Sequence, residues 1–167
     1  RTDRRFEYVV VAPSLPNSSS LATRGNNNWV PIRPAGDSAM AMAMIRWIID
    51  NERYDRNYLI QPGPAAQEAA GEPSWSNDTH LVVSSEDHAL TGRILRGRDL
   101  GWTDNADDSV VVDADSGEWM AHTMPRPAEL FVTREVVLAD GSNVTVKSAM
   151  QRLADEARRL TLSEYSA

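Results

Sequence analysis

Apolar and polar residues group into short runs along the first third of the chain. Residues 6–11 are mostly apolar and rich in Val and aromatic side chains, which predicts a buried strand of a parallel sheet. Residues 12–28 are rich in Pro, Ser, Asn and Gly and predict a loop, and residues 31–34 predict a short extended piece because proline restricts the backbone. A helix is expected from Asp37, as its N-cap, to about Asn51, and apolar residues on most of its sides predict burial between layers.

Two hairpins are predicted further along the chain. Residues 61–78 are rich in Pro, Gly and Ala and predict an irregular excursion over the surface, whereas residues 80–84 predict a strand. Residues 109–121 predict one hairpin around an Asp-Ser-Gly turn. Residues 135–147 carry the stronger hairpin signal, because an Asp-Gly pair lies near their centre between two alternating apolar runs.

The end of the chain predicts two helices in succession. Ser148 is expected to cap a helix over residues 149–160, and Thr161 with Glu164 forms the capping-box pattern of a further helix. Only a few residues follow that box, and residues 1–5 resemble the charged end of an element that begins upstream. The chain is therefore expected to be a piece of a longer polypeptide.

The order of the elements predicts the fold class, which is α/β. Strand, polar loop, short strand, turn and helix together are typical of half of a nucleotide-binding α/β unit. We expect a single three-layer, Rossmann-like domain over residues 1–167, in which residues 6–60 form the ligand-binding half. Residues 61–167 form a β-hairpin-rich extension with a C-terminal helix.

Composition narrows the functions that this chain can have. Its 167 residues are enough for one domain with a real core. The net charge of -7 argues against a nucleic-acid partner, because such domains usually carry a basic patch. The absence of cysteine excludes thiolate metal sites, iron–sulfur ligation and a cysteine nucleophile within the chain. No apolar run is long enough to span a bilayer, so direct membrane contact is not expected.

A candidate ligand site lies where the first strand ends and the first helix begins. The carboxyl end of a strand and a helix N-terminus on one sheet edge form a natural anion site. Ser14, Asn17 and Ser18 offer polar donors there, Gly36 permits close backbone approach, and the Asp37 carboxylate can accept two N–H donors from a guanine edge. The alternative is that Asp37 only caps the helix and the serines only solvate a loop. No G-x-G-x-x-G fingerprint is present.

Three weaker patterns point to other chemistry. His80, His88 and His122 lie in no metal-ligand motif, although the acidic residues between His80 and His88 leave a zinc site open as an alternative to packing or solvent-exposed roles. The many serines leave a Ser-His-Asp hydrolase open, without the G-x-S-x-G turn that would support it. Residues 113–118 imitate the start of a calcium loop, but their spacing fails and a solvated turn is the better interpretation.

Several segments together resemble one enzyme family. They are Val9-Val10-Val11-Ala12-Pro13, the polar loop after it, Tyr54-Asp55, and Trp29-Val30-Pro31-Ile32-Arg33-Pro34-Ala35-Gly36-Asp37-Ser38-Ala39-Met40. This order resembles the molybdopterin oxidoreductase family, typified by dimethyl sulfoxide reductase and formate dehydrogenase, over residues 6–59. Residues 75–82 and 95–101 are most similar to the tetrathionate reductase catalytic subunits within it, and a weaker similarity runs from residue 128 to the end.

The resemblance implies a role for the candidate site. Residues 6–60 would be a cofactor-binding half that holds the guanosine end of one of two molybdopterin guanine dinucleotides. The matching positions are Ala12, Pro13 and Ser14, with Asn17 and Ser18 close by, and the guanine-gripping turn Ala35, Gly36 and Asp37. Two positions depart from the family pattern. Ala12 replaces an acidic or polar residue, and Ala35-Gly36 replaces Gly-Thr, which is expected to shift the flexible position by one.

The resemblance also implies the chemistry of the parent protein. It would reduce tetrathionate to thiosulfate at a molybdenum-bis(molybdopterin guanine dinucleotide), with an iron–sulfur cluster elsewhere in the parent. The expected partners are the rest of the parent polypeptide, a membrane anchor subunit, and an iron–sulfur electron-transfer subunit, in the periplasm. The chain by itself is expected to be inactive. The alternatives are a related reductase of another sulfur or arsenic oxyanion, and a stand-alone nucleotide-binding or interaction domain.

Overall fold

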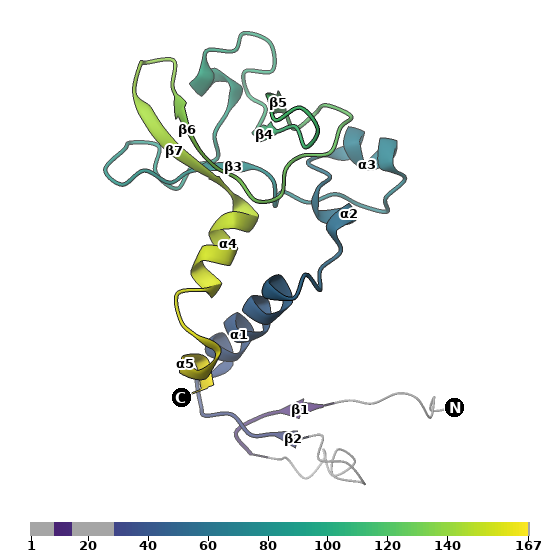
Figure 1. Ribbon diagram of the computed structural model, residues 1–167, viewed down its shortest axis with the longest axis vertical. Coiled ribbons are helices and arrows are strands. Elements are labelled where there is room, and N and C mark those ends of the chain that lie inside the picture. The colour runs from purple at the N-terminus through teal and green to yellow at the C-terminus, as the bar shows by residue number, and fades with distance from the viewer. Residues whose placement is uncertain (1–8, 15–28, 167) are drawn as a thin grey trace. The chain divides into compact units, whose positions relative to one another are not determined.

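The computed structural model describes residues 9–14 and 29–166, with helices and short strands mixed along the chain (Figure 1). The chain forms two compact units. The first unit consists of residues 1–47 and 160–167, and the second unit consists of residues 48–159. None of the helices in the described part combines the length and apolar character needed to cross a lipid bilayer.

The first unit holds a pair of parallel strands, one short helix, and a longer helix except for its last three residues. Strand β1 (Val10–Val11) pairs with β2 (Trp29–Val30), so that Val10 lies opposite Trp29 and Val11 opposite Val30. Helix α1 (Asp37–Asp50) follows β2, and the short helix α5 (Leu162–Ser166) lies near the C-terminus. Two parallel strands are compatible with the predicted three-layer Rossmann-like sheet, which stays a prediction, as does the assignment of the whole chain to one domain.

Both helices of the first unit begin close to their predicted positions. The carbonyl of Gly36 accepts the N–H of Met40 at 3.1 Å, so Gly36 is the cap and Asp37 is the first helical residue. The prediction of Asp37 as N-cap was therefore wrong by one position. The predicted capping box is confirmed, because the N–H of Thr161 donates to the Glu164 carboxylate at 2.6 Å and the N–H of Glu164 donates to the Thr161 hydroxyl at 3.2 Å.

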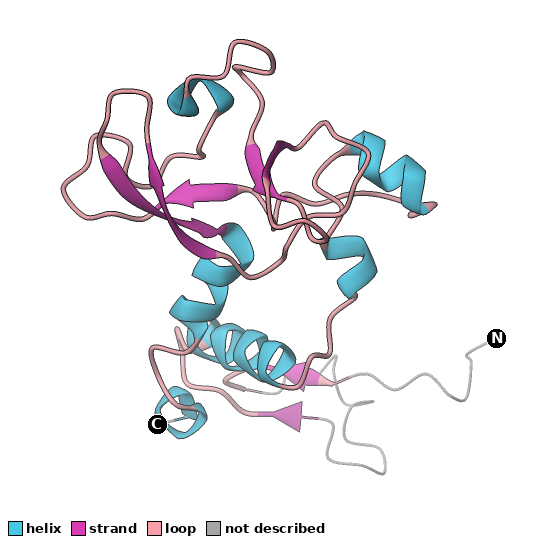
Figure 2. Cartoon of the chain, turned by 45° about the horizontal axis from the view of Figure 1, so that its top comes forward, coloured by secondary structure: helices cyan, strands magenta, loops and turns pink. Residues whose placement is uncertain are grey.

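The second unit contains both predicted hairpins. Strands β6 (Thr133–Val137) and β7 (Asn143–Ser148) are antiparallel, and β3 (Leu81–Val83) pairs with the other side of β7. Strands β4 (Val110–Val112) and β5 (Trp119–Ala121) form the second hairpin. Figure 2 shows these strands as short segments joined by long loops. The Asp-Gly turn was a reliable signal because glycine accepts the positive φ of 84° found at Gly141.

Four short helices complete the second unit: α2 (Arg56–Leu59), α3 (Pro64–Ala70), the 3-10 turn η2 (Gly97–Leu100) and α4 (Ala149–Ala157). The predicted cap of α4 is confirmed, since the Ser148 hydroxyl accepts the N–H of Gln151 at 3.2 Å. Helix α3 corrects the prediction of an irregular segment. Its signals were Pro64 in the first turn and Gly71, whose φ of 71° ends the helix.

Both sheets of the second unit pack around one apolar core. The β3–β7–β6 sheet and the β4–β5 hairpin each contribute fully buried valines, and the loops between them add leucines. The core consists of Leu81, Val83, Leu95, Val110, Val112, Val132, Leu138, Val144 and Val146. This core accounts for the alternation of apolar and polar residues along β7, in which Val144 and Val146 face inward.

Candidate functional site

The parallel pairing of β1 and β2 creates the candidate site. Parallel strands end at the same sheet edge, so the residues that follow each strand lie near one another. Pro13 and Ser14 follow β1 and are exposed, and the segment that leads to α1 follows β2. Asn17 and Ser18 lie outside the described residues.

Ala12 is held on both sides by the second strand. Its N–H donates to the carbonyl of Val30 at 3.3 Å, and its carbonyl accepts the indole N–H of Trp29 at 3.0 Å. The N–H of Ala12 is therefore not available to a ligand. The sequence did not reveal this bond, because it depends on the parallel pairing of the two strands and has no local signature.

In the turn before α1, the residue with a left-handed backbone conformation is Ala35. The N–H of Gly36 donates to the carbonyl of Arg33 at 2.9 Å, and Ala35 has a φ of 65° between them. With Pro34 in second place, this matches a type II β-turn, whose third residue needs a positive φ. The expected shift of the flexible position to Gly36 is therefore corrected. Gly36 instead permits close packing, because a Cβ there would lie 3.0 Å from the Arg33 carbonyl oxygen.

This geometry makes opposite predictions for two neighbouring substitutions. Ala35→Gly is expected to raise the free energy of unfolding by roughly 0.5–1 kcal/mol, because glycine relieves the left-handed strain. Gly36→Ala, the matched control, is expected to lower it, because its Cβ meets the Arg33 carbonyl. Urea denaturation of both variants measures the two effects. A loss of stability in Ala35→Gly would contradict the assigned turn.

The N-terminus of α1 presents donors beside the turn. The N–H groups of Asp37, Ser38 and Ala39 precede the first helical hydrogen bond and so lack a partner within the helix. The positive end of the helix dipole favours an anion or an acceptor there, and the Asp37 carboxylate adds an acceptor of its own. This edge can therefore bind a group that has both acceptors and donors.

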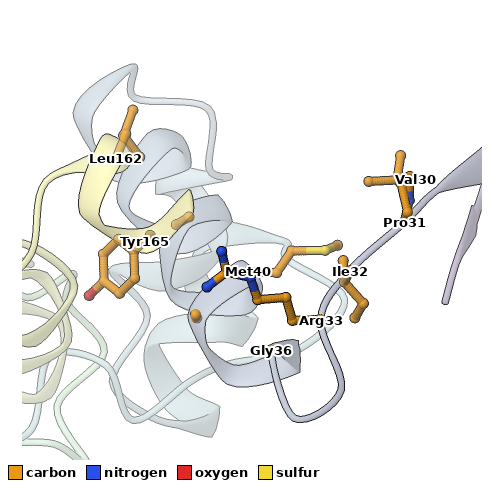
Figure 3. Close-up of a pocket in the computed structure, with 10 residues that line it drawn as sticks. Val30, Pro31, Ile32, Arg33, Gly36, Met40, Leu162 and Tyr165 are labelled. Atoms are coloured by element: carbon orange, nitrogen blue, oxygen red, sulfur yellow. The ribbon is translucent and has the colours of Figure 1, made fainter. Parts of the chain in front are cut away.

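An apolar cavity of about 460 Å³ adjoins the turn (Figure 3). Ile32 and Arg33 come from the segment after β2, Met40 from α1, and Leu162 and Tyr165 from α5. Of the predicted site residues, Gly36 also lines the cavity, whereas Ala12, Pro13, Ser14, Ala35 and Asp37 do not. The predicted site is thus an exposed edge with an apolar wall next to it, and the sequence offered no signal for the contribution of α5.

The histidines have structural partners. His80 is buried, with its Nε2 2.9 Å from the carbonyl oxygen of Pro62, and its ring lies 5.2 Å from that of His122 at 71°. The Nδ1 of His122 accepts the N–H of Ser109 at 3.2 Å. No group of three potential metal ligands exists among the described residues, so the zinc alternative gains no support.

The buried His80 predicts a pH dependence of stability. Burial lowers the pKa of His80 below its ordinary value of 6.5, so the unfolded chain binds a proton more readily than the folded one. Stability is then complete above about pH 6.5 and falls as the pH drops below it. The carboxylate of Asp113, whose pKa is lowered from 3.8, titrates in a separate acidic range. Thermal melting between pH 7.5 and 5 should show the decline in the parent chain and a smaller one in His80→Gln. An equal decline in both would contradict this cause.

Ser142, His88 and Asp140 meet in space but in the wrong order for a hydrolase. The Ser142 hydroxyl donates to Asp140 at 2.6 Å, and Nε2 of His88 lies 3.2 Å from that hydroxyl. Because Nδ1 of His88 accepts the N–H of Leu90, its proton sits on Nε2 and is donated to the serine. A catalytic histidine must instead accept the serine proton and be supported by the aspartate.

The acidic residues of the 104–115 stretch are dispersed among different partners. Asp107 pairs with Arg98 at 2.6 Å, and the Asp108 carboxylate accepts the Thr123 hydroxyl at 2.8 Å. Asp113 is buried against Arg126. Residues 113–118, which imitate the start of a calcium loop, therefore form a turn stabilised by its own side chains, as their spacing in the sequence indicated.

Comparison with known proteins assigns the family. No family model matches the chain. A tetrathionate reductase subunit of Salmonella typhimurium is 49% identical over 167 residues, which cover 99% of this chain and 16% of that protein. A selenate reductase subunit of Mesobacillus selenatarsenatis is 33% identical over 97% of this chain and 15% of its own length. The corresponding tetrathionate reductase subunit of Archaeoglobus fulgidus is 32% identical over 96% of this chain and 13% of its own length.

These relatives are molybdopterin oxidoreductase subunits, and the chain belongs to that family. The similarity to the tetrathionate reductase subunit of Salmonella typhimurium extends over nearly the whole chain. The chain spans only 13 to 16% of the length of these three relatives.

Proposed function

We propose that this chain is part of a molybdenum enzyme that reduces tetrathionate to thiosulfate, and that its first unit anchors a molybdopterin guanine dinucleotide. The identity of 49% with a tetrathionate reductase subunit, against 33% with a selenate reductase subunit, favours tetrathionate as the substrate. Molybdenum bound to the two dinucleotides would supply the two-electron redox chemistry of the parent. The chain by itself contributes binding and is proposed to lack redox activity.

The parallel pairing of β1 and β2 is the observation that carries the anchoring proposal. It brings Ser14 and the turn at residues 33–36 to one edge, and α1 begins there. The donors and the acceptor at this edge match groups that a nucleotide carries. The first N–H groups of α1 can bind an oxygen of the ligand, and the Asp37 carboxylate can accept the two adjacent N–H groups on the Watson–Crick edge of guanine. Gly36 lets this turn close tightly, because a Cβ there would lie 3.0 Å from the Arg33 carbonyl oxygen.

Nucleotide discrimination tests this proposal. Titration calorimetry on the chain should show that GMP binds more tightly than AMP, because adenine lacks the paired donors that the Asp37 carboxylate accepts. Both nucleotides carry the same phosphate, so phosphate binding elsewhere cancels in the comparison. Asp37→Asn should reduce the preference for GMP by about tenfold, since it removes a charge-assisted acceptor. Equal preference in the parent chain and in Asp37→Asn would reject Asp37 as the guanine ligand.

The remaining features of the parent follow from the same proposal. We propose a periplasmic enzyme with an iron–sulfur cluster outside these residues, which works with an iron–sulfur partner subunit, and with a membrane anchor subunit. Activity on another oxyanion is the second candidate, favoured by the similarity to the selenate reductase of Mesobacillus selenatarsenatis. Comparing kcat/KM of the full-length parent for tetrathionate and selenate distinguishes the two.

A further inference from the structure

The second unit carries a groove of about 400 Å³ that no predicted function uses. Its lining residues are Leu90, Arg93, Ile94, Arg96, Arg98 and Asp99. Three arginines thus line one small depression in a chain whose net charge is -7. Residues 95–101, which supply three of these lining residues, have no role in the proposed function.

Two of the arginines are held in place. Nη1 of Arg96 donates to the carbonyl of Asp107 at 3.0 Å and to the Ser109 hydroxyl at 3.1 Å. Both acceptors are uncharged, so they orient the guanidinium without neutralising it. Nη1 of Arg98 pairs with Asp107 at 2.6 Å. Each side chain keeps further N–H donors on its other nitrogens.

The other two charged residues of the groove are Arg93 and Asp99. Arg93 is exposed, and its guanidinium makes no hydrogen bond or ion pair with the described residues. The carboxylate of Asp99 accepts the backbone N–H of Arg96 at 2.8 Å, which ties part of its acceptor capacity to the turn. Within the part of the chain that the structure describes, the positive charge of Arg93 and Arg96 is therefore left without a carboxylate partner.

We propose that this groove binds a small oxyanion that carries two negative charges, through the guanidinium groups of Arg93, Arg96 and Arg98. Arginine forks match the oxygens of such anions, and the groove has the size of a small-molecule site. The choice of anion rests on the proposed function, since tetrathionate and selenate, which name the relatives, are both dianions of this class. The groove would raise the local concentration of the dianion at a chain whose net charge is negative.

Arginine-detected NMR of the full 167-residue chain tests the groove directly. Sodium selenate, sodium sulfate and sodium tetrathionate are titrated separately at constant ionic strength, with sodium chloride as reference. The Nε–H signals of the three groove arginines should shift and saturate with each dianion. Arg93→Gln should weaken binding by about tenfold, because a charge-assisted contact is lost. Arg56→Gln, an exposed arginine of α2, is the matched control and should leave binding unchanged.

The outcomes separate the groove from the nucleotide site. Shifts that do not saturate, or that respond equally to Arg56→Gln, would overturn the proposal as general charge screening. Binding of an oligoglutamate peptide without binding of the dianions would also overturn it, since the groove would then suit an acidic protein segment. The GMP preference of the first unit depends on Asp37, so its failure would leave the groove result intact.

Discussion

Gly97→Ala is expected to lower the free energy of unfolding by about 3 kcal/mol, at the upper end of the cost of overpacking. A Cβ at this position would lie 2.5 Å from the carbonyl oxygen of Asn105 and 2.8 Å from Cε3 of Trp102. The oxygen belongs to the backbone, so the clash cannot be relieved by rotating a side chain. Gly97 is also hydrogen-bonded through its N–H to the Asp108 carbonyl at 3.0 Å, which fixes its position.

Urea denaturation followed by tryptophan fluorescence measures this effect, with Gly92→Ala as the control. Gly92 has a φ of 79° with open space around its missing Cβ, so alanine there introduces backbone strain without a clash. The control is expected to lose only about 1 kcal/mol. Equal losses in the two variants would show that backbone strain, and not the approach to Asn105 and Trp102, determines the cost.

Asp113→Ala is expected to cost about 3 kcal/mol, because it removes a buried carboxylate that accepts two backbone N–H groups and pairs with Arg126. The side chain is 0% exposed, and its Oδ2 lies 2.6 Å from Nη1 of Arg126. Its Oδ1 accepts the N–H of Asp115 at 2.9 Å and of Ser116 at 3.0 Å. The Ser116 N–H is the main cause that lowers the pKa of Asp113.

Asp113→Asn separates the contribution of the two backbone hydrogen bonds from that of the ion pair with Arg126. Asparagine keeps an acceptor for the two N–H groups and loses the charge that faces Arg126, so a smaller loss of about 1 kcal/mol is expected. Because the folded pKa of Asp113 is lowered, its contribution is present above the unfolded value of 3.8 and disappears as the pH falls further. Thermal melting of both variants tests this. Equal losses in Ala and Asn would mean that the ion pair, and not the turn, carries the stabilisation.

The features that were predictable from the sequence have local causes. Both hairpins and the cap of α4 depend on a few neighbouring residues, such as the Asp-Gly turn and Ser148. Within residues 95–101, Leu95 is a core residue, Gly97 is closely packed and Gly101 has a φ of 78°. Local patterns therefore predicted the elements well even where they did not reveal their packing.

The features that were missed depend on residues far apart in the chain. The bond from Trp29 to Ala12 requires the pairing of strands whose residues lie 17 positions apart in the chain, and His80 meets His122 only after folding. The contribution of Leu162 and Tyr165 to the cavity beside Gly36 is of the same kind. Helix α3 is different, because its start and stop signals were present and were outweighed by the high Pro and Gly content.

The central claim is that the first unit anchors the guanosine end of a molybdopterin dinucleotide within a longer molybdenum enzyme. Its most direct test is the molybdenum and guanine-nucleotide content of the purified full-length parent, compared with that of its Asp37→Ala variant. The account predicts molybdenum together with releasable GMP in the parent and a loss of both in the variant. A folded parent protein that contains neither molybdenum nor guanine nucleotide would contradict it.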